Sequence, residues 1–334
     1  MIMYVRGNLF ESPAKVLVNT VNTVGVMGKG IAKTFKEIYP EMFRQYQLAC
    51  ERQLQVGKLW LFKTDHKWIL NFPTKTHWRQ PSKPEYVKQG LEAFVATYAA
   101  KGITSIAFPR LGCGNGELDW QNVVRPMMAK YLRKLAIDIF IYEFNEDDRP
   151  PEHRDIEAMA AWLHSEPRNL AFSEVWTDLC RVIGLGVELQ CWDKSARFRV
   201  NLTDQPSEGL LIQTTPDDVT RSLLSRLMKQ VKDRFKPKLV GSGNVFVPQE
   251  SMLDLWQSIR AYGFCVPSAM PEGLDVLSPY ITALLSRLEY MKPAEISPQS
   301  LYTPGPRETG LRLFASPSPF HPEHSESAYL VHSV

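Results

Sequence analysis

Three glycines stand close together in Gly25–Gly30, after the apolar, strand-like run Val16–Val18 and before a helix-like pattern. A glycine-rich loop between a strand and a helix N-terminus suits phosphate, because free backbone N–H groups and the helix dipole both favour an anion. Asn19 and Asn22 add neutral donors and acceptors that suit ribose hydroxyls. The stretch therefore predicts a nucleotide-like ligand with a sugar beside its phosphates.

Two common phosphate-binding loops do not fit this stretch. A Walker A loop requires Ser or Thr after Gly-Lys, but Gly28-Lys29 is followed by Gly30, and Thr23 replaces the earlier glycine. A dinucleotide fingerprint requires Gly-x-Gly-x-x-Gly, and Lys33 stands at its third glycine. A flexible turn between a strand and a helix remains the alternative from this loop alone.

Lys75 is the side chain whose setting best suits catalysis. It follows a strand-like run, Trp68–Phe72, and a Pro-Thr pair, so we expect it on a loop at a strand end. A lysine amine can attack a sugar carbon once it is neutral, and burial or a nearby cation such as Lys29 lowers its pKa in that direction. Cleavage of an N-glycosidic bond needs such a nucleophile or a general acid–base pair. The alternative is a surface lysine that contacts DNA phosphate.

His77, Trp78 and Arg79 come directly after this lysine loop. An aromatic ring that stacks on an unpaired base, beside a cation for the phosphate backbone, is typical of single-stranded DNA binding. The three residues are therefore candidate DNA contacts. A buried Trp78 that fills the core is an equal alternative.

Four separated stretches of residues 1 to 145 resemble the macrodomain family, whose members bind ADP-ribose. They occur in the family's order and are Gly7–Leu9, Val18–Asn22, Gly25–Gly30 and Pro109–Gly114. Within the family, Asn22–Gly30 followed by Asn71–Trp78 resembles the DarG branch. Members of that branch are antitoxins that remove ADP-ribose from DNA modified by the toxin DarT.

The resemblance implies a role for each matching residue. Lys75 is the implied catalytic residue, and Asn22 the implied ligand of the distal ribose, whereas Asn19 is expected to brace the loop from inside. Backbone N–H groups of the two glycine loops would hold the pyrophosphate. The residues expected to bind ADP-ribose are Asn8, Leu9, Asn22, Val26, Gly28, Lys29, Gly30, Ile31, Gly112, Cys113, Gly114, Asn115, Gly116 and Tyr142.

Two positions depart from the family pattern. Asn8 stands where most macrodomains have an aspartate for the adenine amine, and its uncharged oxygen predicts weaker adenine binding. Some lysine-using relatives have an aspartate where Gly116 stands, so the release of a lysine intermediate is an open question. Cys113, between two glycines, is interpreted as a packing residue rather than a nucleophile. Tyr142 either stacks on adenine or packs in the core.

The composition of the 334 residues is that of a water-soluble protein, with 44% hydrophobic and 22% charged residues. Five scattered cysteines without a C-x-x-C pair argue against a zinc site or disulfides, and the start resembles no signal peptide. We therefore expect a cytoplasmic protein without a membrane span, a metal or a cofactor.

The net charge of +3 is distributed unevenly along the chain, because residues 1–150 hold 21 Lys and Arg against 14 Asp and Glu. This basic half suits a polyanion, although a solvated surface is an equal alternative.

The order of patterns predicts two domains. Residues 1–148 alternate strands and helices, as in a three-layer α/β macrodomain with a central mixed sheet. The polar, Pro-containing residues 149–152 are the predicted linker. Residues 153–291 predict a smaller α+β domain, with a long helix at 217–235 and another at 274–291. The Pro- and Ser-rich residues 292–334 predict an extended or partly disordered tail in which Leu311, Leu313 and Phe314 can dock.

These features favour an enzyme, a DNA ADP-ribosyl glycohydrolase that removes ADP-ribose from thymine in single-stranded DNA. By resemblance, the second domain would bind and neutralise the DarT toxin. Two alternatives stay open: a module that binds ADP-ribose without cleaving it, and an antitoxin that acts purely by protein binding.

Overall fold

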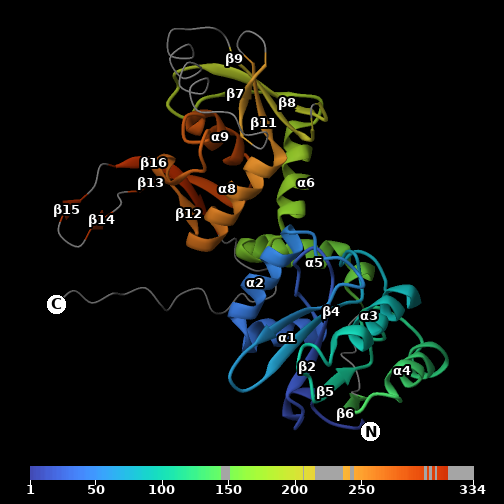
Figure 1. The fold of residues 1–334 in the computed structure, drawn as a ribbon. Coiled ribbons are helices and arrows are strands. Elements are labelled where there is room, and N and C mark those ends of the chain that lie inside the picture. The colour runs from blue at the N-terminus through green and yellow to red at the C-terminus, as the bar shows by residue number, and fades with distance from the viewer. Residues whose placement is uncertain are drawn as a thin grey trace. The chain divides into compact units, whose positions relative to one another are not determined.

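The computed structural model describes residues 1–143, 151–205, 207–214, 236–240, 244–296, 299–300, 303–304 and 307–314 (Figure 1). The chain divides into two compact units, Met1–Leu163 and His164–Val334. The predicted helix at 217–235 and most of the predicted tail lie outside the residues that the structure describes.

The first unit is built on one six-stranded sheet in the order β1-β6-β5-β2-β4-β3. Five strands run parallel, and β3 is antiparallel to its neighbour β4. The sheet is therefore mixed, as predicted. Its strands are β1 (Ile2–Val5), β2 (Val16–Val21), β3 (Trp60–Lys63), β4 (Trp68–Pro73), β5 (Ser105–Pro109) and β6 (Asp138–Tyr142).

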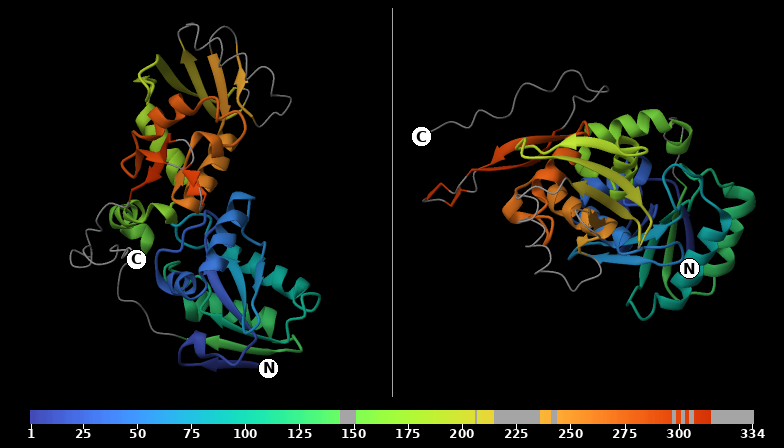
Figure 2. Two further views of the ribbon diagram at one scale, coloured as in Figure 1. Left: turned by 90° about the vertical axis from the view of Figure 1, so that its left-hand side faces the viewer. Right: turned by 90° about the horizontal axis from the view of Figure 1, so that it is seen from above.

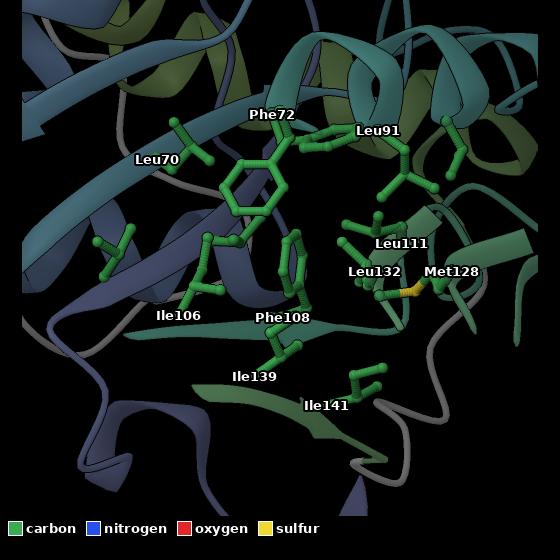
Figure 3. Packing of buried hydrophobic residues seen from close by; sticks show 14 of the residues in the cluster. Leu70, Phe72, Leu91, Ile106, Phe108, Leu111, Met128, Leu132, Ile139 and Ile141 are labelled. Atoms are coloured by element: carbon green, nitrogen blue, oxygen red, sulfur yellow. The ribbon is translucent and has the colours of Figure 1, made fainter. Parts of the chain in front are cut away.

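Helices cover both faces of this sheet. One face packs on α3 and α4 through a core that includes Phe72, Leu91, Phe108 and Met128 (Figure 3). The other face packs on α1 and α2, with Phe35 and Tyr46 among the buried side chains. The helices are α1 (Gly30–Ile38), α2 (Pro40–Glu51), α3 (Pro84–Thr97), α4 (Arg125–Leu132) and, after the short turns η1 (Leu9–Glu11) and η3 (Glu152–Arg154), α5 (Ile156–Ser165).

Alternating apolar runs made this unit predictable, since the expected alternation of strands and helices is present along residues 1–142. The Asp119 carboxylate accepts a 2.9 Å hydrogen bond from the backbone N–H of Asn122 and so caps the helical turn that follows it. One helix differs in form, because its first turn, Trp120–Val124, is π-helical and continues into α4. The three-layer α/β fold is confirmed.

The second unit combines helices with antiparallel sheets (Figure 2). One sheet has the order β10-β11-β9-β8-β7, and another has the order β12-β16-β13. Its helical elements are η4 (Pro167–Asn169), α6 (Phe172–Ile183), α8 (Gln249–Tyr262), η5 (Pro267–Ala269) and α9 (Ser278–Leu285). Its strands are β7 (Val187–Gln190), β8 (Arg197–Thr203), β9 (Gly209–Thr214), β10 (Lys238–Leu239), β11 (Asn244–Pro248), β12 (Phe264–Cys265), β13 (Met291–Ile296), β14 (Gln299–Ser300), β15 (Thr303–Pro304) and β16 (Glu308–Leu313).

One expectation for this unit was wrong in extent. The helix expected at 274–291 is the shorter α9, because the chain turns after Leu285 and enters strand β13 at Met291. In the region predicted as the tail, β13 pairs with β16 and Leu311 is fully buried, which agrees with the expected docking of Leu311. In the part of the chain that the structure describes, no helix has the length and apolar character to cross a membrane.

Candidate active site

The carboxyl ends of three adjacent parallel strands bring the predicted site loops together. Strand β2 lies between β4 and β5. The glycine loop follows β2, the Lys75 loop follows β4, and the loop of Gly112–Gly116 follows β5. Because ligands of open α/β sheets bind outside the carboxyl ends of the strands, this edge is the candidate site.

Asn22 holds the glycine loop in shape. Its amide Nδ2 donates to the carbonyl of Val26 at 2.7 Å, and its Oδ1 accepts from the backbone N–H groups of Val24 and Val26 at 3.0 and 3.3 Å. The Tyr46 hydroxyl donates to the carbonyl of Asn22 at 2.6 Å. These contacts give the Asn22 side chain a bracing role, and ribose binding by it stays a prediction.

Asn19 is fully buried, and its Nδ2 donates to Asn71 Oδ1 at 3.0 Å, from β2 to β4. This position agrees with the expected internal role. The glycine loop is also tied to the lysine loop, because the Thr23 hydroxyl donates to the carbonyl of Thr76 at 2.7 Å. This hydrogen bond fixes the glycine loop and the lysine loop relative to each other.

The second glycine loop is tightly folded and approaches the first. Gly112 has φ +68°, a backbone conformation that favours glycine. A Cβ on Gly116 would lie 2.3 Å from the carbonyl oxygen of Gly112, and one on Gly30 would lie 2.8 Å from Asn115 Nδ2. Both loops therefore need glycine at these points, and they meet near the N-terminus of α1.

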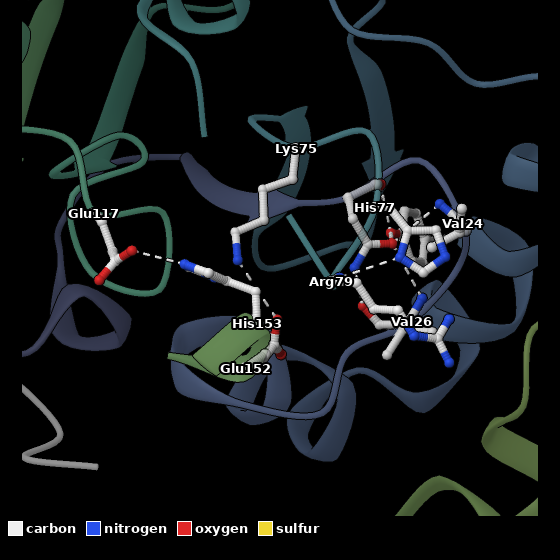
Figure 4. Close-up of polar contacts among 10 residues, drawn as sticks. Val24, Val26, Lys75, His77, Arg79, Glu117, Glu152 and His153 are labelled. Atoms are coloured by element: carbon white, nitrogen blue, oxygen red, sulfur yellow. Dashed lines mark hydrogen bonds and ion pairs between the residues drawn. The ribbon is translucent and has the colours of Figure 1, made fainter. Parts of the chain in front are cut away.

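Lys75 is buried at this edge, with 5% of its surface exposed. Its Nζ lies 3.8 Å from Glu152 Oε2 and makes no hydrogen bond to any residue that the structure describes (Figure 4). Burial lowers the pKa of Lys75, against the opposing effects of Glu152 and Glu117, and Lys29 lowers it further. The environment thus favours the neutral amine that a nucleophile requires.

Glu152 comes from outside the predicted macrodomain. Its side chain is 8% exposed, and burial raises its pKa while the charges of Lys75 and Lys29 oppose that rise. The residue stood in the predicted linker, because polar and Pro-containing neighbours indicate a loop. Its burial arises from tertiary contacts that no local pattern encodes, so Glu152 is a site residue that sequence reasoning missed.

Glu117 joins the same cluster from the second glycine loop. His153 Nε2 lies 2.7 Å from Glu117 Oε2, and Arg154 also pairs with this carboxylate. The hydrogen bond from His153 and the charge of Arg154 hold the pKa of Glu117 below its usual range, although desolvation opposes them. Glu117 is therefore an anion at neutral pH, directed at residues 153 and 154.

The positions of the other predicted ligand residues limit which of their atoms can contact ADP-ribose. Asn8 Oδ1 accepts from the backbone N–H of Phe10 at 3.0 Å and caps a helical turn, and its contact with adenine stays a prediction. The side chains of Leu9, Val26 and Tyr142 are buried. Burial raises the pKa of the Cys113 thiol to about 12, which agrees with a packing role rather than a nucleophile. The remaining predicted ligands, Gly28, Lys29, Gly30, Ile31, Gly112, Gly114, Asn115 and Gly116, lie on the two loops and the start of α1.

The predicted DNA contacts divide into two kinds. Trp78 has no exposed surface, so its ring has no face for a base, and the core alternative describes it better. Arg79 lies over that ring, with Cζ 4.2 Å from its centroid, and its backbone N–H donates to His77 Nδ1 at 3.1 Å. His77 and Arg79 are partly exposed and remain candidate DNA contacts. Among the residues that the structure describes, no cluster of His, Cys, Asp and Glu is arranged to hold a metal ion.

Comparison with known proteins agrees with this fold. The Macro domain family model matches residues 18–127. A DNA ADP-ribosyl glycohydrolase of Thermus aquaticus is 44% identical over 148 residues, which are 43% of this chain and 41% of that protein. A DNA ADP-ribosyl transferase–DNA ADP-ribosyl glycohydrolase fusion protein of Thermosipho africanus is 39% identical over 158 residues, covering 41% of this chain and 40% of the fusion. The human ADP-ribose glycohydrolase OARD1 is 32% identical over 144 residues, covering 42% of this chain and 90% of that enzyme.

The first unit has the fold, the glycine loops and the sequence of a macrodomain, and the chain belongs to the macrodomain family. The two bacterial relatives, at 44% and 39% identity, are named as a DNA ADP-ribosyl glycohydrolase and as a fusion that contains one. The matched segment spans about two fifths of the length of those bacterial relatives.

Proposed function

We propose that this protein is a DNA ADP-ribosyl glycohydrolase of the DarG type, which removes ADP-ribose from thymine in single-stranded DNA. The observation that carries the proposal is Lys75, a buried lysine with a lowered pKa at the strand edge where both glycine loops meet. The names of the bacterial relatives support the reaction class and the DNA substrate.

In this proposal the two glycine loops hold the pyrophosphate, and the ribose lies beside Lys75. The neutral amine of Lys75 donates its electron pair to the anomeric carbon as the bond to the base nitrogen breaks. The electrons of that bond pass to the base nitrogen, which takes a proton. Water then replaces the lysine on the anomeric carbon, which releases ADP-ribose and restores the amine.

The direct test is turnover of a thymine-linked, ADP-ribosylated single-stranded oligonucleotide. Lys75→Ala should lower the rate about 100-fold or more, because the nucleophile is lost. Lys88→Ala removes an exposed lysine of the same unit and should leave the rate unchanged. Binding of ADP-ribose without release by the parent protein would favour the alternative of a non-catalytic ADP-ribose-binding module.

We further propose that the second unit binds a DarT-type toxin. The fusion relative supports the partner, because its name joins a DNA ADP-ribosyl transferase to the glycohydrolase in one chain. An open cavity of about 420 Å³ in the second unit is the candidate binding surface for the toxin. It is lined by Arg168, Phe264 and Arg312, and by Tyr262, which is 72% exposed. Arginine and aromatic residues are enriched where protein interfaces gain most of their affinity.

The full-length Lys75→Ala variant separates binding of the toxin from repair of the DNA. It should still inhibit transfer of ADP-ribose by the toxin in a stoichiometric assay, and adding Tyr262→Ala should weaken that inhibition. A Lys75→Ala variant without inhibitory effect would show that the protein acts through turnover and not by holding the toxin.

A further inference from the structure

Residues 152–162, here called the cover segment, touch all three loops of the candidate site. Glu152 faces Lys75 on the lysine loop, and His153 and Arg154 face Glu117 on the second glycine loop. A Cβ on Gly28 would lie 2.1 Å from Met159 Cε and 2.8 Å from the Trp162 ring, so helix α5 packs directly on the first glycine loop. Trp162 also lies under Lys36 Nζ, 4.7 Å from its ring centroid.

This arrangement closes the site to the proposed substrate. Lys75 is 5% exposed, yet the anomeric carbon that it would attack is attached to a DNA strand. An amine and a carbon must approach to about 3–3.5 Å before they react. The contacts of the cover segment must therefore open before Lys75 can meet that carbon.

Glu152 of the cover segment carries a negative charge, as does the pyrophosphate of the ligand. Glu152 brings a carboxylate, 8% exposed, to Lys75 and within electrostatic reach of Lys29. Lys29 and the Gly28–Gly30 loop are where the pyrophosphate of ADP-ribose is predicted to bind, and the ribose is predicted to lie beside Lys75. The Glu152 carboxylate and the pyrophosphate are both anions near these residues and repel each other, so binding of one weakens binding of the other.

We propose that the cover segment is an internal competitor of ADP-ribose, in which the Glu152 carboxylate occupies Lys75 until the anionic ligand displaces it. The inference rests on the proposed function for the identity of the ligand. Because only molecules with an open site bind ligand, the observed affinity is reduced by the fraction that is open. The device would keep the lysine amine covered in the absence of modified DNA.

The Lys75–Glu152 ion pair has the geometry of a weak interaction that a ligand can disrupt. The two charged atoms are 3.8 Å apart, and Lys75 Nζ is buried without a hydrogen bond to any residue in the described ranges. A buried ion pair recovers its desolvation cost only when good geometry and further hydrogen bonds accompany it. Burial moves the pKa of Lys75 down and that of Glu152 up, which agrees with a weakly held pair. Ligand hydroxyls and phosphates can supply the missing hydrogen bonds.

A catalytic partnership is the competing explanation for Glu152, and it predicts the opposite sign. If the carboxylate served the reaction by exchanging a proton with Lys75, Glu152→Gln would lower turnover and leave the affinity for ADP-ribose unchanged. If it competes with the ligand, the same substitution should tighten binding. One variant therefore separates the two roles.

The test uses the full chain and calorimetry with free ADP-ribose. Glu152→Gln should lower the dissociation constant at least about fivefold, by raising the open fraction. Glu157→Gln, which changes an exposed glutamate of the following helix α5, should leave the dissociation constant unchanged. An unchanged or larger dissociation constant for Glu152→Gln would overturn the proposal. So would a decrease of the same size in the dissociation constant of Glu157→Gln.

Hydrogen exchange on the unmutated protein gives a second measurement that does not depend on a variant. Backbone amides of residues 152–162 should exchange faster when ADP-ribose is saturating, whereas those of β2 and β4 should not. Equal or slower exchange in the cover segment would refute displacement. If ADP-ribose binds and displaces the segment but no modified DNA is cleaved, the proposed function fails and this inference stands.

Discussion

Lys75 can act as a nucleophile only after its ammonium has lost a proton, so its pKa sets a limb of the pH–rate profile. Burial and Lys29 lower that pKa from its ordinary value of 10.5, while Glu152 and Glu117 raise it, and the net direction is downward. A lowered pKa moves the rise in activity toward lower pH. We predict that kcat/KM increases with pH along a limb centred below 10.5 and then reaches a plateau.

The profile is measured with the modified oligonucleotide under single-turnover conditions, so that product release does not mask chemistry. Glu157→Gln serves as the matched control, since it removes an exposed carboxylate of the same unit. If kcat/KM of the parent protein did not rise with pH anywhere below 10.5, deprotonation of Lys75 would not control the reaction.

The conformation of the second glycine loop, Gly112–Gly116, requires that no side chain be present at Gly116. A Cβ on Gly116 would lie 2.3 Å from a backbone oxygen and from Ser82 Oγ, and the backbone has no flexible end to move aside. Gly116→Ala should therefore destabilise the first unit by about 1–3 kcal/mol, which is a loss of several degrees in Tm. Thermal unfolding and ADP-ribose calorimetry measure both effects, and binding should weaken because the loop is displaced.

Gly114→Ala is the matched control for this loop. A Cβ there would meet no atom within 4 Å, so the same methyl group should leave the Tm within about one degree of the parent. If both variants unfolded at the parental temperature, the close packing of the loop against Ser82 would be incorrect.

How far the sequence predicts these elements depends on whether the deciding contacts are local. Apolar runs and the glycine loops follow local patterns, so the strands of the first unit and the loop of Gly25–Gly30 were expected correctly. The exposure of Trp78 depends on what packs over it, and the pattern left two alternatives open. Glu152 was missed for the same reason, because a linker-like composition hides a residue that folds back onto Lys75. The Leu274–Met291 stretch repeats apolar residues on both sides of Leu285, and apolar periodicity alone does not separate a helix from a following strand.

At the scale of the whole molecule, charge is distributed unevenly between the two ends of the chain. Residues 1–150 hold 21 Lys and Arg against 14 Asp and Glu, whereas the remaining residues are net acidic. Binding of a basic surface to DNA releases counterions and therefore weakens as salt rises. For two or three phosphate contacts to a single strand, we predict that kcat/KM on modified DNA falls about tenfold between about 50 and 200 mM salt.

Arg79 is the basic side chain that we expect to contribute to this salt dependence of turnover. It is partly exposed beside the lysine loop, so Arg79→Gln should make the salt dependence of turnover shallower by about one phosphate contact. Arg197→Gln removes an exposed arginine from the second unit and should leave the slope at its parental value. Binding of free ADP-ribose should vary much less with salt in all three proteins, because that ligand carries no DNA backbone. Equal slopes for the two arginine variants would mean that Arg79 does not contact DNA and that the strand leaves the site in another direction.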